Sequence, residues 1–136
     1  MPFALRTATP MGDWRSLKAT ASVNLVGIKD GEATGVSYLY NVNDTVGAVL
    51  ESANAGSQFV LIYHAEKIIV PKKTGQGEDF GLGERVYWDP VARTVTPTQA
   101  KTYYLIGIAT ENAGTTDAYV EIDLDGAGAI LGDEID

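Results

Sequence analysis

Residues 75–90 read GQGEDFGLGERVYWDP, so a glycine-rich loop runs directly into a short aromatic segment that ends at Asp89-Pro90. Four glycines within the nine residues 75–83 argue against a helix, because each costs about 1 kcal/mol relative to alanine in a helix interior. The valine, tyrosine and tryptophan that follow are typical of a strand. This stretch therefore predicts a tight turn that leads into a strand over residues 86–88.

Short β-type segments continue on both sides of this stretch. They are separated by turn residues and cover residues 22–28, 34–40, 58–63, 65–70, 94–96, 103–109 and 118–124. Only residues 45–52 leave a strand and a short helix equally open. Many short strands at near-regular spacing predict an all-β protein. We expect a small antiparallel barrel or sandwich with at most one short helix.

The strand expected over residues 118–124 has the clearest alternation. In its sequence, AYVEIDL, the even-numbered positions are apolar, whereas the odd-numbered positions carry Tyr, Glu and Asp. A period of two places one set on each face of a sheet. One face of this strand should be buried and the other should contact water.

The chain divides into three expected parts. Residues 1–20 contain two prolines and little periodicity, which predicts an extended N-terminal arm. Residues 21–125 should form a single β domain, and residues 126–136 a flexible acidic C-terminal tail. Trp14 leaves two interpretations open, since it could pack on its own domain or dock the arm on a neighbouring subunit.

Charge is distributed unevenly along the chain. The net charge is −8, and the last 26 residues hold eight carboxylates and no Lys or Arg, so the rest is neutral. This pattern argues against a nucleic-acid partner, because a phosphate backbone would be repelled. There is no cysteine, which excludes disulfides and thiolate chemistry. We also expect no signal peptide and no membrane span.

A few residues could carry chemistry, but each has a simpler structural interpretation. His64 is the sole histidine, with Glu66 two residues further on, and a half-buried histidine at a strand end explains it without catalysis. Glu78, Asp79 and Glu84 flank the glycine loop and would be the first candidates for an acid–base pair. Solvated loop charges are the simpler interpretation of all three.

Two partial motifs near the C-terminus fail on their context. Gly126-Ala-Gly128 has its third glycine at 132 instead of 131 and too little chain behind it for a dinucleotide-binding helix. Residues 123–134 match parts of a calcium loop, but Ala127 stands where an oxygen ligand belongs. The sequence therefore predicts no catalytic residue, no cofactor and no metal.

The order of several motifs between residues 65 and 124 resembles a known family. These motifs are IIVPK (68–72), GERVYWD (83–89), TVT (94–96), LIGIA (105–109) and YVEID (119–123). The combination is similar to that of the tailed-phage capsid decoration, or head cement, proteins. Residues 1–20 and the tail after Leu124 extend beyond this pattern.

This resemblance implies a β-rich, non-enzymatic virion protein that sits on the outside of an icosahedral phage capsid and strengthens it against genome pressure. The implied partners are the major capsid protein and further copies of the chain in a homotrimer, with no nucleic acid and no membrane. The implied location is the capsid exterior, after synthesis in the host bacterial cytoplasm.

We expect the arm and the glycine loop to make these contacts. The candidate contact residues are Phe3, Leu5, Trp14, Phe80, Leu82, Tyr87 and Trp88. Two other functions remain open at this point. The chain could be a head-fibre or spike-type module that binds a receptor or carbohydrate on exposed Tyr and Trp side chains, or a small hydrolase that uses the loop carboxylates.

Overall fold

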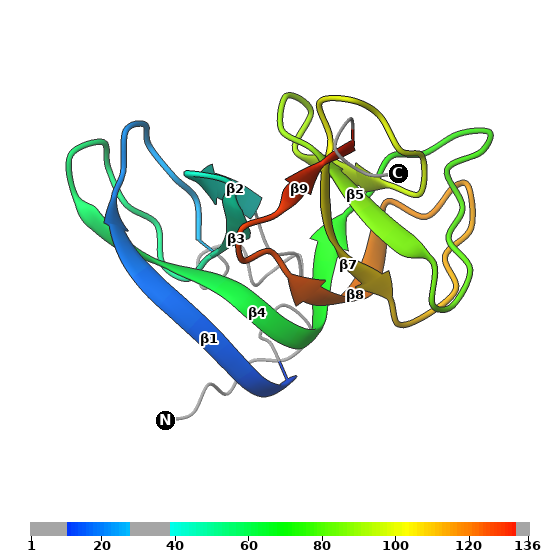
Figure 1. Cartoon of the computed structure of the whole chain (residues 1–136), viewed down its shortest axis with the longest axis horizontal. Coiled ribbons are helices and arrows are strands. Elements are labelled where there is room, and N and C mark those ends of the chain that lie inside the picture. The colour runs from blue at the N-terminus through cyan, green and yellow to red at the C-terminus, as the bar shows by residue number, and fades with distance from the viewer. Residues whose placement is uncertain (1–10, 28–38, 133–136) are drawn as a thin grey trace.

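The structure is a computed structural model that describes residues 11–27 and 39–132, with side chains from residue 15 onward. These residues form nine strands and no α-helix (Figure 1). The strands are β1 (Met11–Thr20), β2 (Leu39–Val42), β3 (Thr45–Val49), β4 (Gln58–Pro71), β5 (Arg85–Asp89), β6 (Thr94–Thr96), β7 (Tyr104–Ala109), β8 (Tyr119–Asp125) and β9 (Ile130–Leu131). All strand pairs are antiparallel, so the prediction of an all-β antiparallel fold is confirmed.

The long strand β4 connects the two halves of the molecule. The sheet order is β2-β3-β4-β8-β7-β5-β6, with β1 added on β4 and β9 on β7. The first half of β4 lies between β1 and β3, and its second half pairs with β8 (Figure 1). A bulge between Ala65 and Ile68 separates the halves, with Lys67 at a φ of 56°. The two strands expected over residues 58–63 and 65–70 are therefore one bulged strand.

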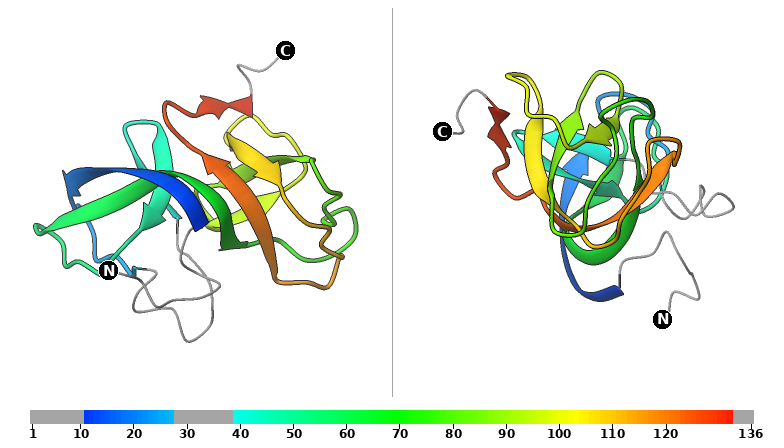
Figure 2. Two further views of the ribbon diagram at one scale, coloured as in Figure 1. Left: turned by 90° about the horizontal axis from the view of Figure 1, so that it is seen from below. Right: turned by 90° about the vertical axis from the view of Figure 1, so that its right-hand side faces the viewer.

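Strands β4, β8, β7, β5 and β6 curl into a small barrel, seen from two sides in Figure 2. A parallel bridge between Lys72 and Val95 brings β6 back to the end of β4. There, the Lys73 amide donates a 2.9 Å hydrogen bond to the Val95 carbonyl oxygen. This closure satisfies backbone groups that an open sheet edge would leave unpaired.

The hydrophobic core has a main cluster and a smaller one. Trp88, Ile106 and Leu124 belong to the main cluster, which fills the barrel and continues under β3. Phe59 and Leu61 belong to the smaller cluster, which lies on the half of the sheet formed around β1. Strand β4 contributes to both, which explains the apolar runs over residues 59–63 and 68–71.

The alternation predicted for residues 118–124 is present in β8. Val120, Ile122 and Leu124 are fully buried, whereas Tyr119 is 45% exposed. Residues 45–49, where strand and helix were both open, form β3 and pair with β2 through a two-residue turn. That turn consists of Asn43 and Asp44, both with positive φ, as a tight hairpin requires.

The segments expected to be the arm and the tail are partly described. Residues 11–20 form β1, which pairs with β4 of its own chain, and residues 130–131 form β9, which pairs with β7. Residues 1–10 and 133–136 lie outside the described residues. The division into arm, domain and tail remains a prediction.

Two further expected strands appear only in part. Within residues 22–28, the described portion forms a single bridge, from Leu25 to Ala53. Of the strand expected over residues 34–40, only the end is described, as the start of β2. Within residues 11–27 and 39–132, no helix has the length and apolar character that crossing a membrane requires.

Candidate functional site

The glycine loop folds against the connection between β7 and β8. Phe80 and Ala113 exchange two backbone hydrogen bonds of 2.8 and 3.0 Å, and the Gly75 amide donates to the Thr115 carbonyl oxygen at 2.8 Å. Together, residues 74–84 and 110–117 form a paired rim at one end of the barrel, which we call the lip. The lip is held by backbone hydrogen bonds, although much of it is exposed.

Leu82 lies at the tip of a tight turn in the lip. The amides of residues 81, 82 and 83 all donate within the lip or to its base. Gly81 donates to Oε1 of Glu84 at 2.7 Å, Leu82 to Oδ1 of Asn112 at 2.9 Å, and Gly83 to the Ala109 carbonyl oxygen at 2.8 Å. The Leu82 side chain is nevertheless 70% exposed. An apolar side chain on a fixed backbone loses little conformational entropy when a partner covers it.

The carboxylates that were candidates for acid–base chemistry hold the loop in place. Glu78 accepts a 2.5 Å hydrogen bond from the Thr96 hydroxyl, and Glu84 accepts from the Gly81 amide. Asp79 is exposed between them. The geometry therefore favours the structural interpretation of these carboxylates. The lip as a whole is acidic, since residues 74–84 and 110–117 contain carboxylates and no Lys or Arg.

Three of the expected contact residues are buried. Phe80, Tyr87 and Trp88 are only 2%, 3% and 2% exposed, so in this conformation they cannot touch another protein. Trp88 packs in the main core. Tyr87 lies opposite Thr96 of β6, and the Thr96 hydroxyl is hydrogen-bonded to Glu78 of the glycine loop. The glycine loop therefore covers this face of β5. The prediction that these three form a contact surface is wrong.

Leu82 is the expected contact residue that the structure leaves available. Phe3 and Leu5 lie outside the described residues. The backbone of Trp14 pairs with Ala65 in the sheet, but its side chain is not among those described. Contacts through these residues stay a prediction.

His64 has no catalytic partner in the described part of the chain. It lies half-buried in β4, between Arg15 of β1 and Asp125 of β8 in the register, and its Nδ1 atom has no hydrogen-bond partner. Glu66 is exposed on the neighbouring bulge. Among residues 11–27 and 39–132, no three His, Asp or Glu side chains gather as a metal site would require.

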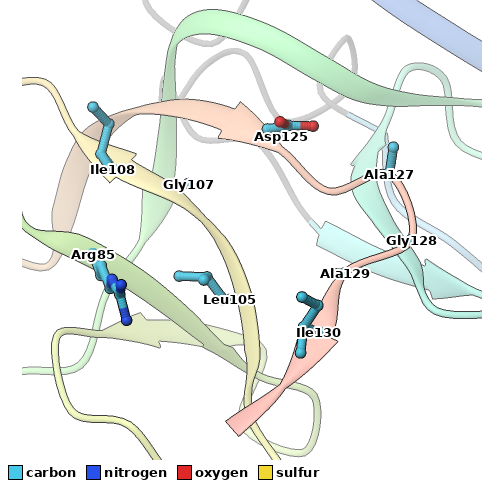
Figure 3. A pocket seen from close by; sticks show the side chains of 9 residues that line it. All are labelled: Arg85, Leu105, Gly107, Ile108, Asp125, Ala127, Gly128, Ala129 and Ile130. Carbon is cyan, nitrogen blue, oxygen red and sulfur yellow. The ribbon is translucent and has the colours of Figure 1, made fainter. Parts of the chain in front are cut away.

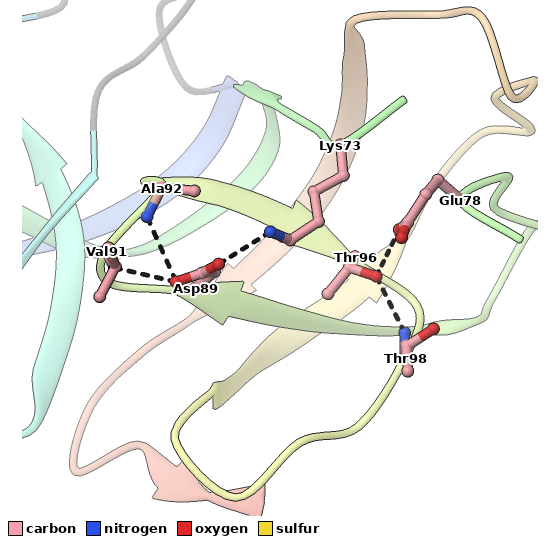
Figure 4. A network of polar contacts seen from close by, with 7 residues as sticks. All are labelled: Lys73, Glu78, Asp89, Val91, Ala92, Thr96 and Thr98. Carbon is pink, nitrogen blue, oxygen red and sulfur yellow. Dashed lines mark hydrogen bonds and ion pairs between the residues drawn. The ribbon is translucent and has the colours of Figure 1, made fainter. Parts of the chain in front are cut away.

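The ion pair that fixes the turn between β5 and β6 is a feature that the sequence analysis missed. Asp89 joins Lys73 through a 2.7 Å ion pair and also accepts hydrogen bonds from the Val91 and Ala92 amides at 2.9 and 3.2 Å (Figure 4). Val91 is 92% exposed on this fixed turn. The Asp-Pro pair indicates the turn itself, because Asp readily bonds backbone amides two residues ahead, but the partner Lys73 comes from another part of the chain.

The ion pair shifts the pKa of both partners. Burial alone would raise the pKa of Asp89, but the hydrogen bonds from Lys73, Val91 and Ala92 outweigh it, so that this pKa lies below its ordinary value. The hydrogen bond to Asp89 raises the pKa of Lys73 above its ordinary value, against a smaller effect of burial. Both groups are therefore charged over a wide pH range, as a structural ion pair requires.

Comparison with known proteins agrees with the motifs. A family model described as phage cement protein matches residues 13–124, which run from the third residue of β1 to the penultimate residue of β8. Among solved structures, the chain is similar to the N base of head fiber gp8.5 in bacteriophage phi29. The identity is 15%, the match covers 85% of this chain and 97% of that chain, and the TM-score is 0.45. No curated protein matches the chain.

The family match over residues 13–124 includes the lip and, except for the ends of β1 and β8, the barrel strands and the pairing of β1 with β4. It therefore spans the elements that shape the exposed surface as well as those that form the core. The chain belongs to the phage cement protein family.

Proposed function

We propose that this protein binds the outer surface of an assembled phage capsid as a homotrimer and stabilises the shell, without catalysing a reaction. As a member of the phage cement protein family, the chain is a structural, capsid-associated protein. The family match over residues 13–124 is the observation that carries the proposal. The engagement of Glu78 and Glu84 in structural hydrogen bonds supports a non-enzymatic role.

The lip is the surface that we propose to contact the capsid. Leu82 would act as its anchor, because it is an exposed apolar side chain on a turn whose backbone amides are hydrogen-bonded. Anchors of this kind contribute most when they enter a pocket that excludes water. The acidic character of the lip favours a partner surface that carries Lys or Arg side chains.

Binding should be strong only on assembled shells. A homotrimer presents three lips, and once the first is bound, the others meet their sites at a high effective concentration. Isolated capsid subunits offer one site each, so they gain no such advantage. The proposed function therefore predicts weak binding to subunits and strong binding to shells.

Cosedimentation with expanded, undecorated shells tests the proposal. Purified wild-type protein should pellet with shells and should remain in solution with isolated subunits. The Leu82→Ser variant should stay largely in the supernatant. Val26→Ser removes another exposed apolar side chain, 51% exposed and outside the lip, and should pellet like the wild type.

Two results would contradict the proposal. Wild-type protein that remains in solution with intact shells would refute capsid binding. Binding to a glycan array without binding to shells would indicate instead a receptor- or carbohydrate-binding module of a head fibre or spike.

A further inference from the structure

A hollow of about 330 Å³ lies beside β7, between the end of β8 and β9 (Figure 3). It exists because the chain leaves the sheet after β8 and returns to it at β9. The Gly126 amide donates to the Tyr63 carbonyl oxygen at 2.8 Å, and the Ala129 amide donates to the Asp44 carbonyl oxygen at 2.6 Å. These bonds hold the connection over the turn between β2 and β3, away from β7. The hollow is thus a fixed feature of the fold.

The hollow combines an apolar wall with two charges at its rim. We define it by the residues Arg85, Leu105, Ile108, Asp125, Ala129 and Ile130. Ile108 and Ile130 are 44% and 46% exposed although both are large apolar side chains. Within the described part of the chain, the Arg85 and Asp125 side chains have neither a hydrogen bond nor an ion pair. The site offers apolar contact and a carboxylate that has no partner among residues 15–27 and 39–132.

We propose that this hollow receives residues 1–10 of a neighbouring copy of the chain. The segment reads MPFALRTATP, in which Phe3 and Leu5 are two residues apart and would lie on one side of an extended chain. They match the apolar wall, whereas Arg6 lies on the other side of the extended chain, from which its long side chain would reach the carboxylate of Asp125 at the rim rather than the wall. Two prolines also make an extended conformation suitable for this segment.

The sheet topology indicates that residues 1–10 enter the hollow of a neighbouring copy rather than the hollow of their own chain. Ala65 of β4 pairs with Trp14 of β1 on one side and with Leu124 of β8 on the other, so β1 and β8 lie on opposite sides of β4. Residues 1–10 continue from β1 and would have to cross both β4 and β8 to reach their own hollow. Ten extended residues span about 33 Å, which is enough to bridge two copies in contact.

An arm that enters the next copy's hollow makes a head-to-tail contact, and such contacts close into rings when the rotation between copies allows it. Three copies joined in this way would form the homotrimer of the proposed function. The inference rests on that part of the proposed function but not on capsid binding.

Disulfide trapping tests the contact directly, because the chain contains no cysteine of its own. The double variant Leu5→Cys/Ile130→Cys should form covalent dimers and trimers on a non-reducing gel under mild oxidation, and reductant should remove them. The matched control is Leu5→Cys/Val91→Cys, since Val91 is 92% exposed but outside the hollow. It should remain monomeric on the same gel.

Three results would overturn the inference. A disulfide within one chain would place the arm in its own hollow, and equal cross-linking of the control would indicate random collision. Absence of any disulfide at residue 130 would show that Leu5 does not reach the hollow.

A charge exchange provides a second, independent test. Asp125→Arg and Arg6→Asp should each shift the midpoint concentration of assembly upward by at least about tenfold, which corresponds to about 1.4 kcal/mol. The double variant should recover most of the loss, as measured by light scattering after size-exclusion chromatography. Asp125 is exposed, so the unfolding midpoint should not change. Single variants that assemble like the wild type would contradict the pairing.

The outcomes also separate this inference from the proposed function. Trapped trimers together with failure to bind shells would leave the arm contact standing and refute capsid binding. Shell binding without any disulfide at residue 130 would support capsid binding and refute the arm contact.

Discussion

Lys73 and Asp89 connect the end of β4 to the turn between β5 and β6, with the Lys73 Nζ atom 2.7 Å from Oδ2 of Asp89. The other oxygen of the same carboxylate accepts the amides of Val91 and Ala92 (Figure 4). Both side chains are largely shielded from water, at 24% and 12% exposure. One carboxylate thus closes the turn and fixes it to the barrel.

The Asp89→Asn variant should lower the free energy of unfolding by about 1–3 kcal/mol, the range for hydrogen bonds to charged groups. The amide oxygen can still accept the turn amides, so the loss should come mainly from the Lys73 interaction. Chemical denaturation measures it. The exposed Asp79→Asn is the matched control and should change stability by less than about 0.5 kcal/mol. Equal values for both variants would contradict the structural role of the pair.

The same pair predicts a pH dependence of stability. Because folding lowers the pKa of Asp89, its contribution is full above the unfolded value of about 4 and is lost as pH falls through the folded value. Because folding raises the pKa of Lys73, its contribution is full below 10.5 and is lost as pH rises further. The stability difference between wild type and Asp89→Asn should therefore be largest between about pH 5 and 10 and shrink toward pH 2. A difference that is constant with pH would exclude this linkage.

Lys72 is buried, at 3% exposure, and its ammonium group donates to three backbone carbonyl oxygens. These belong to Lys73, Gly114 and Asp117, at 2.7, 3.0 and 2.9 Å. Lys72→Met should cost about 1–3 kcal/mol through the acceptors left without a donor. Amide hydrogen exchange should accelerate in residues 113–118, which belong largely to the lip.

The exposed Lys101→Met serves as control for Lys72→Met and should leave exchange in the lip unchanged. Unaltered protection of residues 113–118 in Lys72→Met would show that Lys72 does not hold the lip.

Gly107 allows β8 to approach β7 closely. A Cβ atom at this position would lie 2.0 Å from the carbonyl oxygen of Asp123, so the backbone would have to move. Gly107→Ala should destabilise the protein by about 1–3 kcal/mol in thermal or chemical unfolding. At Gly114, the nearest atom to an added Cβ is a flexible carboxylate oxygen at 3.6 Å, so Gly114→Ala should be nearly neutral. Similar losses for both glycines would contradict the close approach.

Substitutions of Trp88 and Leu82 should differ in their effect on the free energy of unfolding, because Trp88 is a core residue and Leu82 is proposed to act in binding. Trp88→Ala removes a fully packed core side chain and should cost about 3–5 kcal/mol. Leu82→Ser should change the free energy of unfolding by less than about 0.5 kcal/mol, because Leu82 is exposed. Chemical denaturation of both variants checks this. A large loss of stability in Leu82→Ser would mean that Leu82 supports the fold rather than a contact.

The strands with one wet face were the most predictable part of the fold. β8 alternates strictly because its odd-numbered residues contact water while Val120 and Ile122 fill the barrel. β4 was harder, since both its faces are covered and the bulge after Ala65 interrupts the period. Two apolar runs separated by a short polar stretch, here His64 to Lys67, do not indicate whether they form one bulged strand or two strands.

The candidate site was predictable only in part. Aromatic content alone could not show that Tyr87 and Trp88 are buried. Trp88 packs in the main core, and Thr96 of β6, opposite Tyr87, is hydrogen-bonded to Glu78 of the glycine loop. The exposure of Leu82 was easier to predict from the sequence, since a leucine between two glycines at a tight turn has few neighbours that could bury it. The hollow beside β7 depends on how residues 126–129 return to the sheet, which no local pattern indicates.

The central claim is that this protein acts by binding the outside of an assembled shell. Cryo-electron microscopy of expanded, undecorated shells incubated with the purified protein tests it most directly. We predict ordered density on the outer surface, at symmetry-related sites, with the lip around Leu82 facing the shell. Shells that remain bare, or density confined to the interior, would contradict the account.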